Sequence, residues 1–174
     1  MSRTNSVGPA LGALVLAILA WTIIGRGLNA ESGGVLLPLL DGANLIFHEA
    51  GHILFLPFGE FFHYLGGSLT QVIIPALCAV HFLRQQQIAS AYVATFWTGQ
   101  SFANVAIYVA DAKSMDLPLI GGDHDWNYLL ARLGLLNHGV SLGRLIFAVG
   151  VVVILLAIIG LGREFFQRWS GLNP

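Results

Sequence analysis

Residues 44–54 read NLIFHEAGHIL and set His48, Glu49 and His52 into an otherwise apolar run. On an α-helix, positions i and i+4 lie on the same face, so His48 and His52 can hold one metal ion between them. Glu49 lies about 100° round the helix, where it can act as general base on a metal-bound water. Burying these three groups is costly unless they are paired or bind a metal. The pattern therefore predicts a zinc hydrolase site. The alternative is a set of polar groups satisfied by neighbouring helices.

The composition is typical of a membrane protein. Hydrophobic residues make up 56% of the 174 residues, charged residues only 10%, and the mean hydropathy is +0.75. A soluble domain has about 25% charged residues. The net charge is −1 with no basic run, which argues against a nucleic-acid partner. The single cysteine, Cys78, cannot form an intramolecular disulfide. The length suits one domain, residues 1–174.

Five apolar runs predict an all-α, multi-pass integral membrane protein. Its expected surroundings are the membrane lipid bilayer. Each run is about twenty residues long, enough for one spanning helix: 9–24, 35–56, 64–83, 88–110 and 142–161. Five spans place the two termini on opposite faces. Lysines and arginines divide equally between the faces, so they do not set the orientation.

The longest connection between the predicted spans is expected to lie beside the histidine pair. The second span ends on the same side as residues 111–140, and leucines at helical spacing predict a short amphipathic helix at 126–136 on the membrane surface. Catalytic zinc usually has three protein ligands. We expect His124 to be the third, because imidazole is the commonest metal ligand, with Asp125 and Asp111 as alternatives. Asp123 or Asp125 could instead cap the helix that follows.

Other polar and small residues leave two interpretations open. Asp41 and Asn44 share a stripe with the histidine pair, so they either fix the tautomer of a ligand or bond neighbouring helices. The Gly66-Gly67 pair either offers an extended edge to a substrate or allows close helix packing. His63 and His81 are expected to be interfacial or packed histidines rather than ligands.

HEAGH within an apolar helix resembles the site-2-protease group of intramembrane zinc metalloproteases, the M50-like group. The likeness rests on the all-helical membrane setting and on residues His48, Glu49, Gly51, His52, Asn104 and Asp111. In that family an Asn is followed by an Asp-Gly whose aspartate is the third metal ligand. Here Ala112 follows Asp111, and the only Asp-Gly, Asp41-Gly42, precedes the motif. The chain looks like a minimal, divergent member.

Together these features predict a zinc metalloprotease that cuts membrane-associated polypeptides with Glu49 as general base. A zinc-activated water also attacks other carbonyls, so a hydrolase of membrane lipid amides or esters is the first alternative. A non-catalytic membrane subunit with a structural site is the second. Metal content separates this last hypothesis from the two enzymes.

Overall fold

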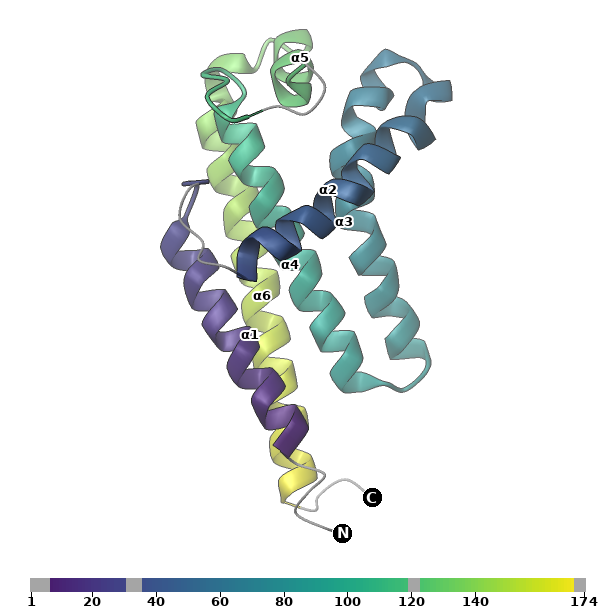
Figure 1. The fold of residues 1–174 in the computed structure, drawn as a ribbon, viewed down its shortest axis with the longest axis vertical. Coiled ribbons are helices and arrows are strands. Elements are labelled where there is room, and N and C mark those ends of the chain that lie inside the picture. The colour runs from purple at the N-terminus through teal and green to yellow at the C-terminus, as the bar shows by residue number, and fades with distance from the viewer. Residues whose placement is uncertain (1–6, 31–35, 119–122, 171–174) are drawn as a thin grey trace.

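The computed structural model describes residues 7–30, 36–118 and 123–170 of the chain. Within these ranges the structure is helical and contains no strand, which confirms the predicted all-α class. The helices are α1 (Val7–Arg26), α2 (Leu36–Phe55), α3 (Glu60–Arg84), α4 (Ile88–Asp111), α5 (Asp125–Arg132) and α6 (Gly139–Trp169), with single 3₁₀ turns at Leu56–Phe58 and Leu136–His138 (Figure 1).

Helix α4 is the centre of the bundle and packs most closely against α6. Both helices carry glycines at their contact: a Cβ at Gly99 would lie 2.8 Å from the Gly150 carbonyl oxygen, and a Cβ at Gly150 would lie 2.7 Å from that of Gly99. This close approach lets the two backbones touch. The adjoining apolar core joins α1, α2, α4 and α6 through Ile23, Leu37, Phe96 and Ile154.

Helix α2 differs from the others because it runs obliquely across the bundle (Figure 1). It begins beside the end of α1 and rises to the end of the molecule that also carries α5. Helices α3 and α4 then form an antiparallel hairpin, and α6 returns beside α1. The beginning of α1 and the end of α6 therefore lie at the same end of the molecule, contrary to the expected placement of the termini on opposite faces.

The prediction of five membrane-spanning helices is not supported. Among the described residues, two helical segments are long and apolar enough to cross a membrane: Glu60–Arg84 and Leu136–Gln167. Helix α2 carries the HEAGH residues and Asp41 within its apolar run, and α4 carries Gln100, Ser101 and Asn104. Asp41 and Asn44 of α2 bond these three α4 residues inside the bundle.

The amphipathic helix predicted at 126–136 exists as α5 but is shorter. It ends at Arg132, and Gly134 in the left-handed region, with a φ of 69°, follows it. Its apolar face is buried within the protein: Leu129 and Leu130 are 1% and 2% exposed, and Leu130 packs with Val109 and Ala112 of the α4 end. The helix thus docks on α4 and carries its first residues to the HEAGH motif.

Candidate metal centre

His48, His52 and Asp125 form a compact group of potential metal ligands. One ligand atom from each lies within 4.8 Å of the others. The Oδ2 of Asp125 is 2.8 Å from Nε2 of His48 and 3.3 Å from Nε2 of His52. The predicted histidine pair is therefore brought together on one face of α2, and its third member is the aspartate that the sequence offered as an alternative.

His124, the expected third ligand, is not part of this group. Its buried imidazole faces away from the pair, because Nε2 lies 3.2 Å from Oδ2 of Asp111 and Nδ1 accepts the backbone N–H of Asn127 at 3.2 Å. This second bond makes His124 the N-cap of α5. The sequence favours His124 as the ligand and leaves Asp123 or Asp125 as possible caps; in the structure His124 is the cap and Asp125 lies in the group of potential ligands.

Asp111, the other alternative for the third ligand, also bonds other groups. Its carboxylate accepts hydrogen bonds from the Ser114 hydroxyl and from the amides of Asp116 and Leu117, in addition to its contact with His124. These bonds close the turn after α4. Asp111 therefore holds the base of the loop that leads to Asp125 and is not placed among the ligand atoms.

The hydrogen bonds behind the two histidines determine which ring nitrogen faces the site. Nδ1 of His52 is 2.8 Å from the carbonyl oxygen of His63, and Nδ1 of His48 is 3.3 Å from Oε1 of Gln71. Both partners are acceptors, so each Nδ1 carries a proton. In the neutral imidazoles each Nε2 then presents a lone pair toward Asp125.

Three acceptors thus converge on one point, and this arrangement fits a cation. A carboxylate and two imidazole lone pairs repel one another unless a positive charge lies between them. Two histidine nitrogens and one carboxylate oxygen are also a ligand set that zinc uses at catalytic sites. The residues therefore suit a divalent metal ion, and the second bonds to His63 and Gln71 are of the kind that orient metal-bound histidines.

Asp125 keeps its negative charge in this setting. When protons rather than a metal occupy the two Nε2 atoms, burial raises the pKa of the carboxyl group, but the hydrogen bonds that His48 and His52 then donate and their positive charge outweigh burial and lower the pKa to about 2. The group is therefore ionised and available to a metal at any pH near neutrality.

Glycines bring α2 and α3 close enough for the site to form. A Cβ at Gly66 would lie 2.7 Å from the Gly51 carbonyl oxygen, so the two backbones touch at the HEAGH motif. A Cβ at Gly67 would lie 2.7 Å from Nε2 of His48. Of the two interpretations of Gly66-Gly67, helix packing is the one that the structure bears out, and Gly67 also leaves the room that the His48 ring occupies.

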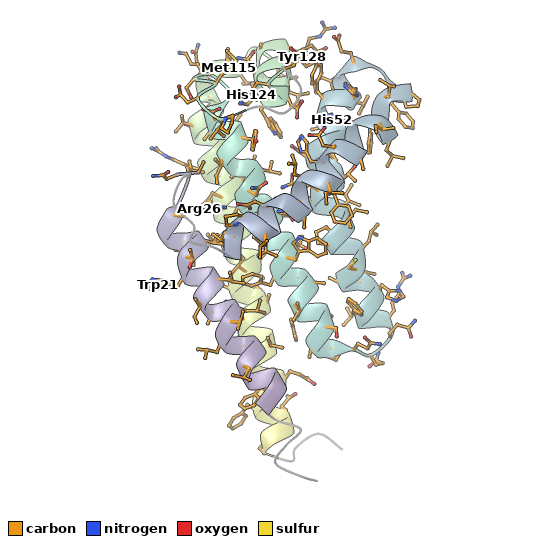
Figure 2. All side chains as sticks on the ribbon, viewed as in Figure 1. Trp21, Arg26, His52, Met115, His124 and Tyr128 are labelled. Atoms are coloured by element: carbon orange, nitrogen blue, oxygen red, sulfur yellow. The ribbon has the colours of Figure 1, made fainter. Side chains whose placement is uncertain are left out.

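Helix α5 is attached to α3 and to the end of α4 by the three residues that follow Asp125. The indole N–H of Trp126 donates to the Ser68 hydroxyl at 3.0 Å, and the Asn127 amide donates to the Ala112 carbonyl oxygen at 2.7 Å. The Tyr128 hydroxyl donates to Glu60 at 2.8 Å. Figure 2 places His52, His124 and Tyr128 at this same end of the molecule. These contacts hold Asp125 over the histidine pair.

A cavity of about 390 Å³ opens beside the three candidate ligands. Glu49 lines it and is exposed, as expected for a group that points off the histidine face without being a ligand. Tyr108, Asn104 and Asp123 line other walls. A reactant in this cavity can therefore meet both the ligand group and the Glu49 carboxylate.

Several other polar residues have roles that the sequence left open or did not reveal. Asp41 and Asn44 bond neighbouring helices, through Gln100, rather than a ligand directly. His81 is exposed at the far end of α3, as expected. His63 does not join the ligand group, but its ring Nδ1 and the His52 carbonyl oxygen are 2.9 Å apart, which makes the His52–His63 contact reciprocal.

No protein-family model, curated protein or solved structure matches this chain. The resemblance to site-2 proteases therefore stays a prediction that rests on the residues themselves.

Proposed function

We propose that the chain is a membrane-embedded zinc metallopeptidase with His48, His52 and Asp125 as its metal ligands. The observation that carries this proposal is the convergence of two imidazole Nε2 atoms and one carboxylate oxygen beside an exposed Glu49 in one cavity. Zinc is the metal we favour because an open site with two histidines and one carboxylate is typical of zinc hydrolases. The HEAGH resemblance supports a peptide bond as the substrate.

Each polar group of the site has a distinct task in this proposal. Bound zinc supplies Lewis-acid chemistry, lowering the pKa of water and polarising a carbonyl. Glu49 accepts the proton of the attacking water at its carboxylate and later returns it to the leaving amine. His52 and His48 hold their Nε2 atoms toward the metal while their Nδ1 protons are engaged by His63 and Gln71.

Exposed apolar faces support placement in a bilayer. Helix α6 carries a row of large, exposed hydrophobic side chains: Leu145, Val149, Val152, Leu155, Leu156 and Ile159 are each 43% exposed or more. On α1, Trp21 is 82% exposed and projects away from the bundle (Figure 2). Such a continuous apolar surface needs a nonaqueous environment or a partner. Because the chain would lie in a bilayer, the peptide substrate that can reach its site is a membrane-associated polypeptide.

The deciding experiment compares the detergent-purified parent protein with Glu49→Gln. Peptides derived from membrane segments and a panel of lipid amides and esters are offered to both. We expect peptide cleavage by the parent, and a variant that keeps zinc but loses turnover by about a hundredfold or more. The exposed Asp116→Asn serves as the matched carboxylate control and should cleave normally.

Each alternative has its own signature in this experiment. Cleavage of lipids but not of peptides would show that the substrate is a lipid amide or ester and not a peptide. Zinc binding without any turnover would leave a structural site. Parent-level cleavage by Glu49→Gln would remove Glu49 from the mechanism.

A further inference from the structure

A row of hydrogen bonds connects His48 with Asp41 through the interior of the bundle. Nδ1 of His48 is 3.3 Å from Oε1 of Gln71, the Gln71 amide nitrogen is 2.7 Å from Oδ1 of Asn104, and the Asn104 amide nitrogen is 2.9 Å from Oδ1 of Asp41. Asp41 in turn pairs with Arg26 at 3.1 Å. The row therefore joins a candidate metal ligand on α2 to the end of α1 by way of α3 and α4.

The direction of every bond in this row follows from the carboxylate at its end. A carboxylate only accepts, so Asn104 must turn its NH₂ group toward Asp41 and its oxygen toward Gln71. Gln71 must then turn its own NH₂ toward Asn104 and its oxygen toward His48. His48 can satisfy that oxygen only with a proton on Nδ1, and its Nε2 is left free to bind a metal.

The Arg26 guanidinium pairs with the Asp41 carboxylate at the end of this row. The Arg26 side chain is 3% exposed, and besides the contact with Asp41 its Nε and Nη2 atoms are buried without a hydrogen-bond partner among the described residues. Figure 2 shows Arg26 where α1 ends beside the beginning of α2.

We propose that Asp41, held by Arg26, is a positioning residue that sets the metal-binding tautomer of His48 through Asn104 and Gln71. This inference rests on the proposed metal site, but it adds a requirement outside the HEAGH motif. A network that served packing alone would affect stability without affecting the choice of tautomer.

Asp41→Asn conserves the shape of the row but takes away the carboxylate oxygen to which both Asn104 and Gln100 donate. Asparagine has one acceptor oxygen, which Arg26 attracts, so its NH₂ group faces Asn104. Asn104 and Gln71 then turn over, and Gln71 offers an N–H to His48. The proton of His48 moves to Nε2, where it blocks the metal. We expect zinc affinity to fall tenfold or more, as for other lost outer contacts of metal-bound histidines.

Substitutions at Gln71 test the same inference one bond from the metal ligand. Gln71→Glu keeps an acceptor against His48 and should therefore keep the zinc affinity of the parent. Gln71→Met has a similar volume but no acceptor, so it should lose tenfold or more. Thr95→Val is the matched control, because the Thr95 hydroxyl donates to the Ala91 carbonyl oxygen of its own helix and is not part of the row. It should leave zinc affinity unchanged.

Two measurements decide the outcome. Zinc affinity is measured by competition with a chelator, and the ¹⁵N shifts of His48 in the zinc-free protein report its tautomer. If Asp41→Asn is not folded, the Gln71 pair decides alone. Parent affinity in Gln71→Met, or an Nδ1–H tautomer in a folded Asp41→Asn, would overturn the inference. Parent affinity in His48→Ala would instead reject the metal site on which it rests.

Discussion

The Oδ2 atom of Asp125 lies 2.8 Å from Nε2 of His48, although 77 residues separate them in the chain. His48 belongs to the oblique helix α2, and Asp125 is the first residue of α5. The candidate metal site is therefore complete only when α5 is docked on the bundle. Neither helix alone carries a full ligand set.

Asp125→Ala is expected to abolish stoichiometric zinc binding, because two histidines alone leave the metal short of protein ligands. His124→Ala should keep the metal, since His124 contacts Asp111 and caps α5 without facing the histidine pair. The lost cap should lower the free energy of unfolding by about 1 kcal/mol. Metal analysis and chemical denaturation of both variants measure the two effects. Zinc loss in His124→Ala with zinc retained in Asp125→Ala would restore His124 as the ligand.

Gly67→Ala should weaken zinc binding, because the added methyl group would lie 2.7 Å from Nε2 of His48 and displace the ring. Zinc affinity measured by chelator competition should fall by at least tenfold. Gly162→Ala on α6 is the control, since a Cβ there meets nothing within 4 Å. It should be neutral or stabilise the helix by up to about 1 kcal/mol. Equal zinc affinity in the two variants would show that the His48 ring does not need the space beside Gly67.

Zinc occupancy should fall as the pH is lowered from 7 to 5, and the fall should come from the two histidines. Protons compete with the metal for neutral imidazole nitrogens. Asp125 does not compete in this range, because its pKa is lowered to about 2 and it stays ionised. Occupancy measured against pH should therefore approach two protons per zinc. A dependence on a third proton above pH 4 would show that the Asp125 carboxyl titrates in the normal range.

The HEAGH part of the site could be predicted from the sequence because its geometry is local. Positions i and i+4 share one helix face in any α-helix, so His48 and His52 converge whatever the rest of the fold does. The side of the molecule that supplies the third ligand also followed, from the order of the apolar runs. The choice among Asp125, His124 and Asp111 did not follow, because it depends on which of two adjacent side chains caps α5.

The number of spans and the role of Gln71 depend on contacts between distant segments. An apolar run gives no sign of whether its helix lies along the bundle, as α3 does, or crosses it, as α2 does. Gln71 is one of several polar residues in α3, and only the packing of α3 against α4 places it between His48 and Asn104. Such pairings become visible only when the tertiary structure is in hand.

Labels placed at the beginning of α1 and at the end of α6 should be accessible from the same side of a membrane. These two helices lie antiparallel, with Leu19 and Ile23 of α1 packed in one cluster with Ile154 and Ala157 of α6 (Figure 1). Single cysteines introduced in a Cys78→Ser background, at Gly12 and at Arg163, can be tested with a reagent that does not cross the bilayer. A third cysteine at the exposed Met115, on the loop before α5, should react from the opposite side. Reaction of the Gly12 and Arg163 positions from opposite sides would reject this arrangement and restore an odd number of spans.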